Sequence, residues 1–194
     1  IYSQEDFNVI KTIPNIKKLK LSYINFQEYN LSDLPKQIEE LCLDYCTLEN
    51  VQEIEQFTNL NKLDISGRQY SDQELKGLEI VNNLKKLKEL KIANLQLTNI
   101  DFLRDNESIE TLDVSTNKIT DISVVKTMKN LNNFYCQYNN IQDVTILKDT
   151  EFLKSGNSIA QSLKYDVEAI SGDQIKIELP QTIKSALDSN DDTF

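Results

Sequence analysis

Apolar and polar residues alternate in short blocks that recur along most of the chain. Each block has the pattern apolar-x-x-apolar-x-apolar, as in residues 60–65, and most blocks begin 22 residues after the previous one. The six blocks begin at Ile16, Ile38, Leu60, Leu87, Ile109 and Leu131. Alternation at period two is typical of a strand with one buried face. We therefore predict six short strands whose first, fourth and sixth residues point inward, while the residues between them point outward.

The ninth position of each repeat follows the predicted strand and suits a buried amide. Asn117 and Asn139 occupy this position in the last two repeats, and Cys46 occupies it in an earlier one. A buried Asn side chain there can satisfy backbone groups of adjacent turns that otherwise lack hydrogen-bond partners. The remaining repeats carry other residues at this position: Ile24, Arg68 and Leu95. The predicted asparagine ladder is therefore incomplete.

Between the strands, apolar residues recur at a spacing of three. The matching sets are Val51, Ile54 and Phe57, then Ile122, Val125 and Met128, then Val144 and Leu147. This spacing suits short 3₁₀ or irregular helical segments on the opposite side of the sheet. Phe7, Ile10 and Ile13 have the same offsets, which indicates the tail of a repeat or an atypical capping turn.

The third repeat is five residues longer than its neighbours. Residues 71–74, Ser-Asp-Gln-Glu, have the form of a capping box and precede a helical apolar pattern. We therefore predict an α-helix from about Asp72 to Leu84, as a tolerated insertion on the outer side of the repeats.

The period and the block together are typical of leucine-rich repeats, which stack into a solenoid. The predicted fold class is α/β, with a concave parallel β-sheet and convex 3₁₀ or short helices. The predicted solenoid covers residues 1–154, with a partial first repeat, and residues 155–194 form a C-terminal cap or the start of a junction domain. Strict alternation from Gln174 to Leu179 predicts that this ending is of β type.

Composition argues against several functional classes. The net charge of −10 repels phosphate backbones, so we expect no nucleic-acid partner, and no run is apolar enough for membrane insertion. The chain has no His and four Gly, which makes an enzyme, a cofactor cradle or a small-molecule substrate improbable. Its three Cys fit neither a disulfide framework nor a zinc site, and we expect no metal.

A protein partner on the concave face is the remaining expectation, since a solenoid exposes a long surface there. Solvent-facing tyrosines are the best candidates for contact because aromatic anchors dominate binding hot spots. Two outward-facing clusters and an acidic pair between them supply the candidate residues: Tyr23, Asp44 and Tyr45; Tyr135, Gln137 and Tyr138; Asp64 and Asp113. Cys42 also faces outward and is a candidate reactive thiol. We expect the protein to be a monomer.

The segment Asn117-Lys118-Ile119-Thr120-Asp121-Ile122-Ser123 resembles the Asn-x-Ile-x-Asp-Ile-Ser segment of internalin-like bacterial leucine-rich repeats. Val124-Val125 stands where internalins usually have Pro-Leu. Residues 157–159, 172–175 and 179–180 resemble the immunoglobulin-like junction that follows such repeats. The resemblance implies a secreted or surface-attached bacterial protein with a role in adhesion and virulence, which binds another protein, often one of a host.

A second resemblance remains open. Four segments are similar to the cap of intracellular eukaryotic repeats such as the leucine-rich regulator of type-1 protein phosphatase: Gly156-Asn157-Ser158-Ile159-Ala160, Tyr165, Leu179-Pro180 and Leu187-Asp188. Ser158 and Asp166 depart from that cap, which prefers Gly-Asn-Pro and Tyr-Arg. This alternative implies a cytoplasmic regulatory subunit that binds an enzyme through the same concave face.

Overall fold

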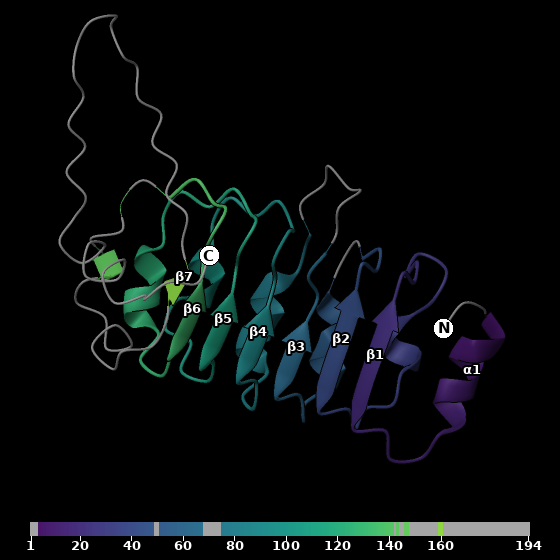
Figure 1. Ribbon diagram of the computed structural model, residues 1–194. Coiled ribbons are helices and arrows are strands. Elements are labelled where there is room, and N and C mark those ends of the chain that lie inside the picture. Colours follow the sequence, from purple (N-terminus) through teal and green to yellow (C-terminus); the bar gives the residue numbers. More distant parts are fainter. Residues whose placement is uncertain are drawn as a thin grey trace, which may run out of the picture.

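A computed structural model shows a curved solenoid built on one parallel β-sheet (Figure 1). It describes residues 4–48, 51–67, 75–141, 143, 146–147 and 159–160. The sheet has the order β1-β2-β3-β4-β5-β6-β7. Its strands are β1 (Lys18–Ser22), β2 (Glu40–Asp44), β3 (Lys62–Asp64), β4 (Glu89–Lys91), β5 (Thr111–Asp113), β6 (Asn133–Tyr135) and β7 (Ile159–Ala160). The predicted α/β leucine-rich repeat solenoid is confirmed.

The strand register confirms the repeat alignment. Leu41 pairs with Leu63, and Leu63 with Leu90, so equivalent block positions lie side by side. From the second repeat to the sixth, the first, fourth and sixth residues of each block are buried, as predicted. In the first block Ile16 and Leu19 are half-buried, because their repeat lies at the end of the array. The core is thus a continuous apolar column between the sheet and the convex side.

The convex side consists of short 3₁₀ helices: η1 (Leu31–Asp33), η2 (Gln52–Gln56), η3 (Leu78–Asn83), η4 (Asp101–Leu103) and η5 (Ser123–Thr127). The apolar residues at spacing three point into the core, as Val51, Ile54 and Phe57 show with 0% exposure each. A 3₁₀ helix has three residues per turn, so this spacing places them on one face.

The predicted α-helix from Asp72 to Leu84 is wrong over the residues that the structure describes. There the chain forms the 3₁₀ helix η3, which begins at Leu78. Gly77 precedes it with a φ of 82°, a left-handed conformation that a right-handed helix cannot contain. Leu78, Val81 and Leu84 then pack inward like the apolar residues of the other convex turns. Residues 71–74 of the predicted capping box lie outside the described residues.

An α-helix, α1 (Gln4–Thr12), covers the first end of the solenoid beside β1 (Figure 1). Phe7 is 1% exposed and its ring lies 4.9 Å from that of Tyr29 and 6.3 Å from that of Phe26. The prediction of a 3₁₀ or irregular segment here is therefore wrong, and Ile13 is 45% exposed rather than buried. A spacing of three also fits one face of an α-helix, so the pattern alone could not separate the two.

The asparagine ladder is confirmed in the last two repeats. Asn117 Oδ1 accepts hydrogen bonds from the backbone N–H groups of Leu95 and Leu97, at 2.9 and 3.0 Å. Its Nδ2 donates to the carbonyls of Ile92 and Val114, at 2.9 and 2.8 Å. Asn139 makes the equivalents of three of these four contacts one turn later, with the N–H of Ile119 and the carbonyls of Val114 and Cys136. Cys46 makes a longer contact of 3.7 Å from its thiol to a neighbouring carbonyl, as a weak substitute.

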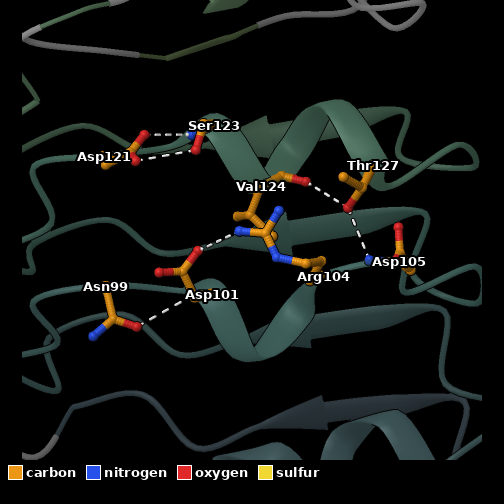
Figure 2. Close-up of polar contacts among 8 residues, drawn as sticks. All are labelled: Asn99, Asp101, Arg104, Asp105, Asp121, Ser123, Val124 and Thr127. Atoms are coloured by element: carbon orange, nitrogen blue, oxygen red, sulfur yellow. Dashed lines mark hydrogen bonds and ion pairs between the residues drawn. The ribbon is translucent and has the colours of Figure 1, made fainter.

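Side chains also fix the turns that lead into the convex helices (Figure 2). Asn99 Oδ1 accepts the backbone N–H of Asp101, and Asp121 accepts both the backbone N–H and the hydroxyl of Ser123. These are Asx turns, in which a short polar side chain stands in for a backbone partner. They explain the Asn-x-Ile-x-Asp-Ile-Ser pattern in part, since its Asp holds its Ser.

The sheet continues into the region predicted as a cap. β7 pairs in parallel with β6, with Phe134 opposite Ile159. The other residues from 148 to 194 lie outside the described residues, including the strand predicted from Gln174 to Leu179. The division at residue 154 therefore stays a prediction.

Candidate functional site

The outward residues of the strands form columns across the concave face. The third block position reads Lys18, Glu40, Lys62, Glu89, Thr111 and Asn133 from β1 to β6. The fifth position reads Lys20, Cys42, Asp64, Lys91, Asp113 and Tyr135. The third-position column is charged from β1 to β4 and uncharged at β5 and β6, whereas the fifth-position column carries its last charge at Asp113 on β5.

Ion pairs join the charged part of these columns. Lys18 contacts Glu40 at 2.6 Å, and Lys20 contacts Asp44 at 3.1 Å. The Lys62 ammonium lies 2.8 Å from the Glu89 carboxylate, which also has Lys91 at 3.4 Å.

These pairs shift the ionisation of their members. The hydrogen bond from Lys20 to Asp44 raises the pKa of Lys20. Partial burial alone would raise the pKa of Glu89, but the neighbouring Lys62 and Lys91 lower it overall. Each charge between β1 and β4 that the structure pairs in this way is already satisfied within the chain.

Asp64 and Asp113 occupy equivalent places at the ends of β3 and β5. In each case Oδ1 accepts the backbone N–H two residues ahead, of Ser66 or Ser115, at 3.0 Å. Lys91 lies between the two aspartates in the register. The two aspartates of the predicted acidic pair therefore lie in the same column of the concave face, with Lys91 between them. One oxygen of each carboxylate stabilises the turn that follows its strand.

The C-terminal part of the concave face is polar and carries a single charge in the two columns, that of Asp113. Asn133 donates a hydrogen bond to the hydroxyl of Thr111 at 3.2 Å, and Tyr135 lies opposite Asp113. Gln137 follows β6, and its Oε1 is buried without a hydrogen-bond partner among the described residues. A buried acceptor without a partner costs free energy.

The eighth position of every repeat has a left-handed backbone. The φ angles are positive at Tyr23, Tyr45, Gly67, Asn94, Thr116 and Tyr138. This conformation lets the N–H of Tyr23, Gly67, Asn94 and Thr116 donate to the seventh-position carbonyl of the next repeat, at 2.8 to 3.0 Å. The backbone at this edge is thus fixed from repeat to repeat. We call the seventh and eighth positions together the strand-end rim: residues 22–23, 44–45, 66–67, 93–94, 115–116 and 137–138.

Tyrosine side chains project from both ends of the strand-end rim. Tyr23 and Tyr138 are 73% and 69% exposed. The rings of Tyr23 and Tyr45 stack, with centroids 5.4 Å apart and an angle of 7° between the planes. On its other side Tyr45 lies against Gly67, where an added Cβ would be 3.3 Å from the ring. The absence of a side chain at Gly67 therefore makes room for this stack.

The structure brings the first predicted cluster together and places the second at β6, next to the last described strand of the sheet. Tyr23 and Tyr45 touch, and Asp44 lies beside them on β2. Tyr135, Gln137 and Tyr138 follow one another at β6. Sequence reasoning missed the role of Gly67. Gly and Asn at the eighth position of adjacent repeats are the signal for a left-handed backbone that could have revealed it.

The cysteines lack the environment of reactive thiols. Burial and then the Asp64 charge raise the pKa of Cys42, against a smaller opposite effect of Lys20. Burial raises the pKa of Cys46 to about 11 and that of Cys136 to about 12. A thiol reacts as its thiolate, so the interpretation of Cys42 as a reactive group is not supported.

The residues that the structure describes offer neither a metal site nor a membrane span. Among them, no group of three or more His, Cys, Asp or Glu side chains is arranged to hold a metal ion. In the same part of the chain, no helix is long and apolar enough to cross a membrane.

Known structures of similar fold include internalins of Listeria monocytogenes strain 4b F2365. No protein-family model matches the sequence, and no curated protein matches it. The structure of an internalin (inlF) superimposes with a TM-score of 0.64 at 16% identity, covering 83% of this chain and 50% of that protein. Internalin C2 (inlC2) gives a TM-score of 0.51 at 22% identity, covering 75% of this chain and 69% of the other. The chain thus spans half the length of the first internalin, and it has the leucine-rich repeat solenoid fold of these proteins.

Proposed function

We propose that this chain is a non-enzymatic recognition module that binds another protein through the concave side of its solenoid. We further propose a secreted or surface-attached bacterial protein whose partner is a protein of a host. The likeness in fold to internalins supports this proposal over the cytoplasmic regulatory subunit.

The observation that carries the proposal is the set of exposed tyrosines on one edge of the sheet. Tyr23, Tyr45 and Tyr138 expose 73%, 38% and 69% of their surface. An exposed ring gains little for folding, whereas Tyr is among the residues that dominate binding hot spots. A rigid ring also loses little conformational entropy when a partner covers it.

The distribution of charge favours the C-terminal half of the face as the centre of binding. Between β1 and β4, ion pairs such as Lys62 with Glu89 must be desolvated when a partner covers them, at a cost that offsets their attraction. At β5 and β6 the surface offers Thr111, Asn133 and Tyr135, which can form hydrogen bonds without being charged themselves, and Asp113 is the single charge that the two columns place there. Interfaces are depleted of charged residues at their centre, in line with this choice.

Affinity capture tests the proposal, with the chain as bait against host surface extract and cytosol in parallel. The control baits are Tyr135→Ala/Tyr138→Ala on the concave side and Lys126→Ala on convex η5. We expect the wild type and Lys126→Ala to capture a host surface protein that the double variant does not capture. Capture of a cytosolic phosphatase would instead support the regulatory subunit, and equal capture by all three baits would contradict the proposed face.

A further inference from the structure

We propose that the strand-end rim holds an extended basic segment of the partner protein, with tyrosines at its ends and Asp64 and Asp113 beside its middle. This inference rests on the proposed function and deepens it, because it names the line of contact and the chemistry of the bound segment.

The composition of the strand-end rim resembles that of an antibody combining site. From β1 to β6 its residue pairs are Ser-Tyr, Asp-Tyr, Ser-Gly, Ala-Asn, Ser-Thr and Gln-Tyr. Tyr, Ser, Gly and Asn are the residues that antibody loops favour, because Tyr supplies rigid contact area and the small polar residues supply adaptable hydrogen bonds. Ser115 is buried, and Ser66 Oγ accepts the backbone N–H of Ala93. The members that a protein segment can reach are therefore the eighth-position residues Tyr23, Tyr45, Asn94, Thr116 and Tyr138.

Large and small residues are unevenly placed along the strand-end rim. Tyr45 and Tyr138 follow β2 and β6, and the three repeats between them carry Gly67, Asn94 and Thr116 at the same position. Four strand spacings of about 4.8 Å separate the two tyrosines by roughly 19 Å. An extended chain rises about 3.3 Å per residue, so a segment of about six residues fits between the rings.

Tyrosine is also conformationally strained at the eighth position of the repeat. Tyr23, Tyr45 and Tyr138 have φ angles of 60°, 52° and 57°, where the Cβ of an L-residue is crowded. Gly or Asn would adopt this conformation with less strain and without exposing an aromatic ring. Tyr23 and Tyr45 recover part of this strain by stacking on each other, and the large exposed surfaces of Tyr23 and Tyr138 remain suited to contact with a partner.

Charge at the middle of the strand-end rim favours a basic segment. The carboxylates of Asp64 and Asp113 each lie 3.0 Å from a rim backbone nitrogen, and Asp64 also accepts a hydrogen bond from the Cys42 side chain. Both place negative charge beside the middle of the strand-end rim. Lys91 lies between them in the register, and its ammonium is 3.4 Å from Glu89, whose carboxylate also contacts Lys62. At longer range, the net charge of −10 attracts a basic partner and speeds its association.

The test is a selection from a random displayed hexapeptide library against the purified protein. We expect enriched sequences with Arg or Lys at a central position. Tyr138→Asn suits the left-handed backbone and should lower the affinity for the enriched peptides by about 30-fold, which is typical of the loss of a hot-spot residue. Asp64→Asn/Asp113→Asn keeps a side-chain oxygen that can accept the hydrogen bond of each turn. It should lower the affinity for the enriched peptides by about fivefold.

The matched control is Asp105→Asn/Asp121→Asn on the convex side (Figure 2). It changes the net charge equally, keeps the Asx turn at Asp121 and leaves the left-handed Asp105 with a residue suited to it. This control should bind the peptides like the wild type. The inference would be overturned if no peptide were enriched or if the enriched peptides lacked a basic residue. It would also be overturned if both pairs of substitutions lowered the peptide affinity equally.

The inference and the proposed function fail in different ways. If the captured partner depends on Tyr135 but not on Asp64, Asp113 or Tyr45, the concave face binds it and the strand-end rim does not. If neither set of substitutions affects a captured partner, both proposals are wrong.

Discussion

At the scale of single residues, the backbone of the strand-end rim depends on one glycine. Gly67 has a φ of 95°, and an added Cβ would lie 3.3 Å from both the ring and the backbone nitrogen of Tyr45. The same eighth position in the next repeats holds Asn94 and Thr116, also left-handed. Of these three residues, Thr116 is the least suited to a positive φ because its side chain is β-branched.

Gly67→Ala should therefore lower the free energy of unfolding by about 1–2 kcal/mol and disturb the stack of Tyr23 on Tyr45. Thr116→Asn should raise it by about 0.5 kcal/mol, since Asn tolerates this conformation better. Urea unfolding measures both. A stabilising Gly67→Ala would contradict the described packing of Tyr45.

Asn117 is the buried polar residue with the most demanding set of partners that we describe. Asn117→Ala removes the acceptor of two backbone N–H groups and the donor to two carbonyls. We expect a loss of about 3 kcal/mol in the free energy of unfolding, since buried groups are left unpaired. Asn132→Ala, at an exposed position one block away, should change it by less than about 0.5 kcal/mol. Equal effects of the two substitutions would argue against the ladder.

The thiols provide a check of burial that depends on pH. Burial raises the pKa of Cys136 from 9.0 to about 12, so at pH 8 its thiolate fraction is roughly one in ten thousand. This raised pKa contributes stability below pH 9, which is lost as the pH rises toward 12. With a thiol reagent at pH 8, the native protein should react slowly at all three Cys and the denatured protein rapidly. Rapid reaction of Cys136 in the native state would show that the core is open there.

At the scale of elements, the sequence predicted the strands better than the helices. The six blocks predicted β1 to β6 and their register because a period of two fixes which residues face the core. Apolar spacing of three did not distinguish a 3₁₀ helix from an α-helix, so both α1 and η3 were wrongly predicted. The predicted α-helix at η3 is interrupted by Gly77, which has a left-handed backbone. That conformation can be recognised only once the chain is folded.

Helix α1 should be essential for the first repeats although it lies outside the repeat pattern. Phe7→Ala removes a ring that packs on Phe26 and Tyr29, and should lower the free energy of unfolding by about 3 kcal/mol. Val9→Ala, on the exposed side of the same helix, should change it by less than about 0.5 kcal/mol. Urea unfolding again measures both, and a similar loss in the two variants would mean that α1 does not pack as described.

At the scale of the whole molecule, the candidate site was predictable in part. Position within the block placed Asp64, Asp113 and Tyr135 in one outward column, because the repeat period carries equivalent residues side by side. The stack of Tyr23 on Tyr45 and the left-handed strand-end rim could not be predicted, since they depend on how turns of neighbouring repeats meet. The partner itself is not encoded in the repeat pattern, which specifies the solenoid and leaves its outward residues free to vary.

The central claim is that a partner protein binds the concave side, and site-specific photo-crosslinking tests it most directly. A photoreactive amino acid replaces Asn133, which faces outward on β6, or Lys126 on convex η5, in separate preparations. Each preparation is mixed with the captured partner and irradiated. We predict a crosslink to the partner from position 133 and none from position 126. A crosslink from position 126 alone would contradict the account and place the partner on the convex side.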